Sequence, residues 1–164
     1  MMKTWMILLA ALAVPAGPAM AQELTYSDEA TESCLAQVDE GGDPRGCIGR
    51  SAELCMETSE GGYSTVGMGG CLDRERDYWD GILNARYGAL RQRAGDFDAA
   101  GGPGGTETAL RDMQRAWIAF RDATCAFEGS QWGGGTGAGP AAVSCLMRMT
   151  GEQALYLDTA WSEG

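Results

Sequence analysis

Six cysteines constrain the fold of this 164-residue chain more than any other feature of the sequence. They are Cys34, Cys47, Cys55, Cys71, Cys125 and Cys145. An even number of cysteines in an exported chain is typical of disulfides. A zinc site is a poorer explanation, because the chain has neither a Cys-x-x-Cys pair nor a histidine to complete it. We therefore expect three disulfides and neither a metal ion nor any other cofactor.

The N-terminus has the pattern of a secretion signal. Lys3 precedes a short apolar run at residues 6–14, and Ala19-Met20-Ala21 has the small-x-small pattern of a cleavage site. The run is too short for the roughly 20 residues that a membrane-spanning helix needs. We predict a signal peptide at residues 1–21 and a single domain at residues 22–164, in the periplasm or secreted, with no membrane span.

The charge of the chain excludes several classes of function. The formal net charge is −11, and removal of the signal peptide with Lys3, the only lysine, makes it −12. Such a chain is repelled by nucleic acid and by anionic membrane surfaces. Its acidity either favours encounter with a cationic protein partner or serves solubility alone. The absence of histidine removes the usual general base and the Ser-His and Cys-His pairs. A pair of carboxylates can cleave a glycoside, but Glu128 is the one acid near a plausible loop cleft, and no second acid is marked. We predict that the chain is not an enzyme.

Hydrophobic spacing indicates an all-α fold, and no stretch has the two-residue alternation of a strand. We predict a small disulfide-linked helical bundle with glycine-rich loops at 61–70, 101–105 and 129–139. The predicted helices cover residues 27–38, a segment from Pro44 through Cys55, residues 72–94, residues 106–127 and residues 141–161, the last interrupted near Thr150.

The helix pattern selects among the possible disulfide pairings. Cys34 and Cys47 lie nearly symmetrically about the turn between the first two helices, so they can face each other. Cys47 and Cys55 on one helix would be about 12 Å apart, which is too far for a disulfide. The same reasoning pairs Cys55 with Cys71 and Cys125 with Cys145, each across a glycine-rich loop.

Two of the predicted helices have an apolar face. On the helix at 72–94 this face holds Leu72, Trp79, Leu83, Tyr87 and Leu90, and residues 73–77 are predicted to cover the exposed side. On the helix at 106–127 the apolar face holds Leu110, Met113, Trp117, Phe120 and Phe127.

Two motifs on these helices carry a resemblance to a known family. One is Leu83-Asn84-x-x-Tyr87, and the other runs from Gln114 through Trp117, Arg121 and Asp122 to Cys125. A glycine-containing loop that starts at Gly129 and Ser130 then leads to Cys145, and a last segment contains Thr150, Glu152 and Leu155. In these motifs, over about residues 47–157, the chain resembles the LprI-like lysozyme inhibitor family, formerly a domain of unknown function. It departs from the family pattern at Gln153, where arginine is frequent, and in the unusually glycine-rich loop at 129–140.

We interpret most of the motif residues as structural. Gln114, Trp117, Arg121 and Cys125 recur every three or four residues and line one stripe of a helix. We expect Trp117 to fill the core, with Gln114 and Arg121 bound to polar groups at loop ends; a binding face is the alternative. Asn84 and Tyr87 are expected to be structural too.

Trp132 is different, because it lies in a glycine-rich loop outside the helical pattern. An exposed aromatic side chain there could anchor a partner, with Glu128 nearby, or it could fold back onto the bundle. The resemblance implies an exported protein that binds and inhibits a lysozyme-type muramidase, such as a cationic lysozyme, and we expect occlusion of the enzyme's cleft by this loop. The alternative is a non-catalytic envelope scaffold or adaptor for another periplasmic partner. The sequence predicts no oligomeric state.

Overall fold

The computed structural model of the chain describes residues 23–39 and 41–161, and it is all helical over these residues. The predicted signal peptide lies outside the described residues. The helices are α1 (Glu29–Ala36), the 3-10 helix η1 (Pro44–Cys47), α2 (Arg50–Thr58), α3 (Thr65–Ala99), α4 (Thr106–Ser130) and α5 (Ala138–Thr159). The predicted all-α fold class is therefore confirmed.

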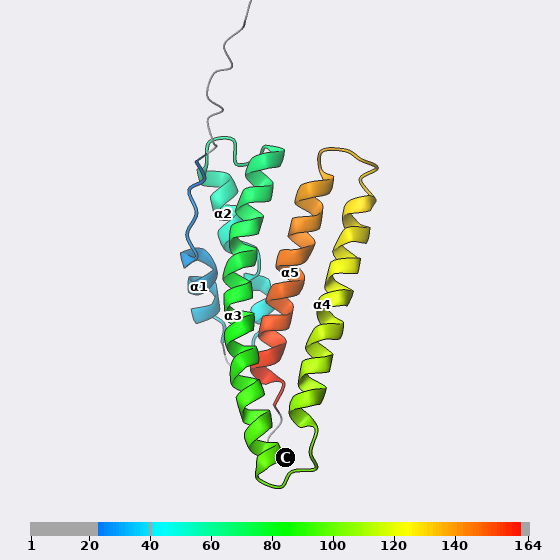
Figure 1. Cartoon of the computed structure of the whole chain (residues 1–164). Helices are drawn as coiled ribbons and strands as arrows, with labels where there is room; N and C mark the ends of the chain where they lie inside the picture. Colours follow the sequence, from blue (N-terminus) through cyan, green and yellow to red (C-terminus); the bar gives the residue numbers. More distant parts are fainter. Residues whose placement is uncertain (1–22, 40, 162–164) are drawn as a thin grey trace, which may run out of the picture.

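Three long helices form the body of the bundle (Figure 1). Helix α5 packs against both α3 and α4, and the shorter α1 and α2 lie on the side of α3 that faces away from α4. Helices α3 and α5 run in the same direction and α4 runs in the opposite one. Both α3 and α5 therefore begin at the same end of the molecule, next to the α4–α5 loop.

The three disulfides pair as the helical pattern predicts. The Cα–Cα distances are 5.5 Å for Cys34–Cys47, 5.7 Å for Cys55–Cys71 and 5.3 Å for Cys125–Cys145. The first joins α1 to η1, the second α2 to α3, and the third α4 to α5. In the chain-entropy model each closed loop of this size stabilises the fold by about 3 kcal/mol.

Some predicted helix boundaries are wrong. The segment from Pro44 through Cys55 is two helices, because Gly49 between them takes a positive φ of 99°. Helix α3 begins at Thr65 instead of Leu72. Ser64 caps it by accepting a hydrogen bond from the Gly67 backbone. Gly67 is needed there because a Cβ would collide with the carbonyl oxygen of Gly61.

Helix α5 also differs from the prediction. It begins at Ala138 and runs without interruption through Thr150, which is fully buried in the bundle. The interruption that we expected near Thr150 is therefore absent, and residues 150–153 belong to one continuous helix. Pro140 is compatible with this helix because it lies in the first turn, where no intrahelical partner for its backbone nitrogen is required.

The apolar face of α3 is as predicted, but that of α4 is not. Leu72, Trp79 and Leu83 are buried in the main core. Phe120 and Phe127 of α4, which we expected on the core face, are 63% and 65% exposed. The α4 residues that face the bundle are centred on Gln114, Cys125 and Gly129 instead.

The side chain of Glu75 lies at the centre of the structure, fully buried, although the sequence pattern placed it on the exposed side of α3. Its Oε1 accepts hydrogen bonds from the Thr31 hydroxyl at 3.0 Å, the Gly49 backbone at 2.7 Å and the Trp79 indole at 3.0 Å. Its Oε2 accepts from the Ala52 backbone at 2.7 Å. Four donors therefore satisfy the buried carboxylate, and two of them are backbone groups at the start of α2.

We predict that Glu75→Ala lowers the free energy of unfolding by about 3 kcal/mol or more, because it leaves these buried donors without an acceptor. Glu75→Gln should lower the free energy of unfolding by a smaller amount. The remaining side-chain oxygen of glutamine still accepts hydrogen bonds, so only the donor that would face its amide nitrogen loses its partner. Chemical denaturation followed by circular dichroism measures both changes. Equal stability of the Ala variant and the native protein would contradict this role for Glu75.

A second carboxylate caps α4 from the end of α3. Asp98 accepts hydrogen bonds from the backbone of Thr106 and of Glu107, each at 3.1 Å. The Thr106 side-chain hydrogen bond and the backbone bond from Glu107 lower the pKa of Asp98. The carboxylate replaces intrahelical partners that the first backbone N–H groups of α4 lack, and it lies where the helix dipole favours a negative charge.

A lowered pKa means that Asp98 stabilises the fold above the ordinary aspartate pKa and that this contribution is lost as the pH falls through the folded-state pKa. We predict that Asp98→Asn lowers the melting temperature at neutral pH. The difference from the native protein should shrink as the pH falls below about 4. Melting curves over a pH series test this, and a difference independent of pH would contradict it.

Candidate partner-binding end of the bundle

The motif residues of α4 make three successive contacts with α5 along the interface between the two helices. The side-chain amide nitrogen of Gln153 donates a hydrogen bond to the side-chain oxygen of Gln114 at 3.0 Å, and Gln114 is buried. Next along the interface, Arg121 reaches the hydroxyl of the buried Thr150 at 3.4 Å. The Cys125–Cys145 disulfide follows. The spacing of three or four residues in each helix thus aligns polar partners across one helix pair.

Trp117 packs against the main core, where we expected it, although it is not fully buried. It is half-buried, and the Arg121 guanidinium lies over its ring, 4.9 Å from the centroid. Arg121 also pairs with Asp122 at 2.9 Å. The polar partners of Gln114 and Arg121 are therefore side chains in the middle of α5 and on α4 itself, not groups at loop ends.

The Leu83-Asn84-x-x-Tyr87 motif lies on α3. Leu83 is buried in the main core, and Tyr87 is half-buried against it. Asn84 is exposed and donates a hydrogen bond to Asp80 at 2.8 Å, one turn earlier on the same helix. The structure thus brings Leu83 and Tyr87 into the packing, while the contacts of Asn84 are local.

We predict that Arg121→Ala lowers the free energy of unfolding by about 1–2 kcal/mol, because it removes the contacts with Trp117 and Thr150. Arg74→Ala is the matched control, since Arg74 is an exposed arginine on α3. Differential scanning calorimetry compares the two. Unchanged stability of the Arg121 variant together with a loss of partner binding would favour the alternative, in which this stripe is a binding face.

The α4–α5 loop presents Trp132 at one end of the bundle. Its side chain is 56% exposed, and its ring lies against the backbone of Gly137, where a Cβ would collide with it. Gly133 and Gly134 take positive φ values of 57° and 80°, and the Gly135 backbone donates to the Trp132 carbonyl oxygen at 2.9 Å. The glycines thus let a tight turn hold one face of the indole while the rest faces solvent.

Glu128, the acid that we placed near this loop, is paired. Its carboxylate accepts from Arg148 of α5 at 3.0 Å, and Arg148 is also 3.6 Å from Glu152. The pair lies partly exposed across the α4–α5 interface. The structure therefore places Glu128 beside the loop but in contact with α5.

A groove that we did not predict lies at the same end, between the starts of α3 and α5. It has a volume of about 420 Å³ and is lined by Thr65, Val66, Gly69, Gly70, Asp73, Gly139, Pro140 and Val143. Val66 is 73% exposed, and Tyr63, which precedes α3, is exposed as well. The sequence contained one feature that could have indicated this groove. Residues 61–72 and 129–147, which supply most of its lining, contain no charged side chain.

The electrostatics of this end differ from those of the rest of the chain. Neither α3 nor α5 has an acidic residue in its first turn. Because the two helices are parallel, the positive ends of both dipoles lie at this end of the bundle, as does the negative end of the antiparallel α4. In a chain with a net charge of −11, the two segments that meet at this end are uncharged, although Glu60, Asp73 and Glu128 border them.

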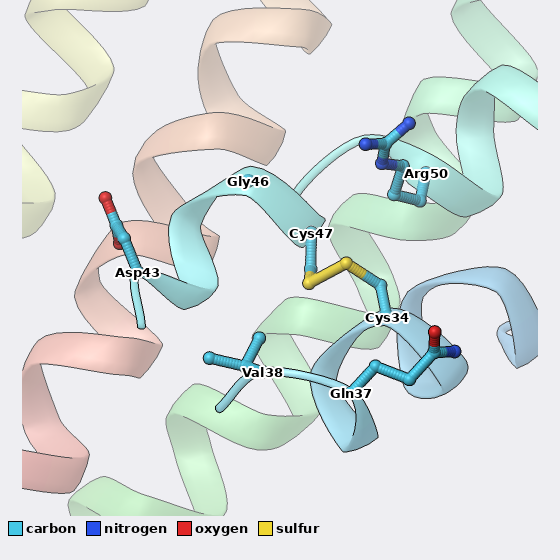
Figure 2. A pocket seen from close by; sticks show the side chains of 7 residues that line it. All are labelled: Cys34, Gln37, Val38, Asp43, Gly46, Cys47 and Arg50. Atoms are coloured by element: carbon cyan, nitrogen blue, oxygen red, sulfur yellow. A yellow bond between two sulfur atoms is a disulfide. The ribbon is translucent and has the colours of Figure 1, made fainter. Parts of the chain in front are cut away.

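A second hollow, of about 450 Å³, surrounds the Cys34–Cys47 disulfide (Figure 2). Asp43 and Arg50 lie on opposite sides of this disulfide, and their charged groups do not converge. Asp43 accepts the hydrogen bond that caps η1, from the Arg45 backbone at 3.0 Å. These residues are therefore explained by local structure.

The described residues contain no group of three or more acidic, cysteine or histidine side chains placed to hold a metal ion. In the same part of the chain, no helix has the length and apolar character that crossing a membrane requires.

The fold is that of a small all-α protein held by three disulfides, and comparison with known proteins identifies its family. The family model described as "Lysozyme inhibitor LprI" matches residues 55–157, more than half of the chain. The chain therefore belongs to the LprI family of lysozyme inhibitors, as its motifs led us to expect. It is also 28% identical over 137 residues to an uncharacterized 17.7 kDa protein in the puhA 5' region of Rhodobacter capsulatus, with 79% of this chain and 83% of that protein covered. No solved structure matches the chain.

Proposed function

We propose that this chain inhibits a lysozyme-type muramidase by placing the end of the bundle that carries Trp132 in the enzyme's substrate cleft. Membership of the LprI family supports an inhibitory role, and the geometry of this end supports the mode of binding. We also propose that residues 1–21 are removed on export, and that residues 22–164 act as one domain in the periplasm or outside the cell, where disulfides persist.

The observation that carries the proposal is the distribution of charge. A cleft that cleaves glycosides contains two carboxyl groups, so an acidic probe would be repelled from it. The segments 61–72 and 129–147 meet at one end of the bundle and have no charged side chains, and α3 and α5 both begin there. The acidic remainder of the chain would attract a cationic enzyme from a distance, and this end would make the contact.

Trp132 supplies the apolar contact in this mechanism. Large aromatic side chains dominate binding energy when they are held rigidly and become desolvated on binding. The turn at Gly133 and Gly134 fixes the indole against Gly137 before any partner arrives, so little entropy is lost on binding. The exposed Val66 and Tyr63 add apolar surface on the neighbouring loop and helix start.

Titration of the mature protein against several lysozymes tests the proposal, with the clearing of a cell-wall suspension as the measured rate. We expect stoichiometric inhibition of at least one of them, and we expect Trp132→Ala to weaken it by at least about tenfold. Tyr156→Ala is the matched control, because Tyr156 is an exposed aromatic residue near the C-terminal end of α5.

A second pair of variants tests the charge argument. Gly139→Asp and Gly88→Asp each add one carboxylate at an exposed helical position where a Cβ meets nothing within 4 Å. Gly139 lines the groove and Gly88 lies in the middle of α3. The first variant should inhibit less and the second should inhibit normally. The absence of inhibition by a molar excess of folded protein would refute the proposal and favour the envelope scaffold or adaptor.

A further inference from the structure

The solvent-facing side of α4 carries a second apolar stripe, of which the bundle covers only Met113, packed against the main core. Its members are Ala109, Met113, Ala116, Phe120, Ala123 and Phe127. They follow one another at spacings of four, three, four, three and four residues, which is the heptad pattern of a coiled coil. All except the half-buried Met113 are exposed, and Phe120 and Phe127 are 63% and 65% exposed.

The stripe alternates large and small side chains in register. Met113, Phe120 and Phe127 occupy one of the two heptad positions, and alanine occupies the other position three times. In an antiparallel pair of helices, residues at one heptad position pack against the other position of the partner helix. A two-fold axis near residue 118 places Phe120 on Ala116 of a second copy and Phe127 on Ala109. Each large side chain then meets a small one, and the alanines let the helices approach closely.

The charge of the stripe segment fits the same arrangement. Arg115 and Asp122 lie roughly 130° around α4 from the centre of the stripe, so neither charge enters the packed surface. Residues 109–127 contain three arginines and two aspartates, so this segment has a charge of +1 in a chain with a net charge of −11. Two acidic molecules could therefore approach along this face with little repulsion.

From the self-complementary pattern and these charges, we propose that the protein forms a symmetric dimer in which the α4 stripes of two copies pack antiparallel. The two contacting surfaces are the same patch, as a two-fold interface requires. Dimerisation through α4 leaves the end that carries Trp132 outside the interface, and it does not depend on the proposed inhibition of lysozyme.

Sedimentation of the mature protein over a concentration series tests the dimer. We expect a monomer–dimer equilibrium, with Phe120→Asp weakening the association by more than about tenfold because it places a charge in the packed stripe. Leu54→Asp is the matched control, since Leu54 is an exposed apolar residue on α2. Circular dichroism establishes that each variant is folded. A monomer at concentrations up to about 1 mM, or a dimer unaffected by Phe120→Asp, would overturn the proposal.

Cross-linking tests the antiparallel register. A short bismaleimide should cross-link Ala119→Cys between copies, because residue 119 lies next to the two-fold axis. It should fail with Ala126→Cys, whose partner would be about 24 Å away along the helix. Cross-linking of Ala126→Cys would exclude this register.

Discussion

The arrangement of the short N-terminal helices depends on one buried carboxylate. Glu75 holds Thr31 of α1, the backbone of Gly49 and Ala52 at the start of α2, and the indole of Trp79 on its own helix. Helices of eight and nine residues are too short to be stable alone in water, so their stability comes from what they pack against. The buried carboxylate of Glu75 is fixed on α3 and specifies one position for α1 and for α2. If either helix were displaced, the carboxylate would lose hydrogen-bond donors.

The other half of the bundle is organised by a different set of contacts. Between α4 and α5 the Gln114–Gln153 amide pair, the contact of Arg121 with Thr150 and the Cys125–Cys145 disulfide follow one another along the interface. These contacts fix how the two helices slide and rotate relative to each other. They thereby fix where the connecting loop, and Trp132 within it, is presented.

The sequence was sufficient to predict the helical class and the disulfide pairing, because both follow from short-range spacing. It did not reveal the burial of Glu75, because an acid between two arginines has the local pattern of a solvated face, and three of its four donors come from distant parts of the chain. Periodicity identified an apolar stripe on α4 that mixed two faces, since Trp117 lies towards the bundle and Phe120 and Phe127 face solvent. Spacing shows that a helix has an apolar stripe, but not whether its own chain covers it. Glycine was ambiguous in the same way, because Gly67 serves close packing within a helix while Gly133 and Gly134 serve a turn.

The order of the disulfides along the chain has a consequence for biogenesis. The cysteines are joined in consecutive pairs along the chain, first to second, third to fourth and fifth to sixth, with separations of 13, 16 and 20 residues, and no bridge encloses another. A polypeptide that crosses a membrane N-terminus first exposes these pairs one after the other. An oxidase that joins cysteines in the order of their emergence would therefore form these three pairs and no other.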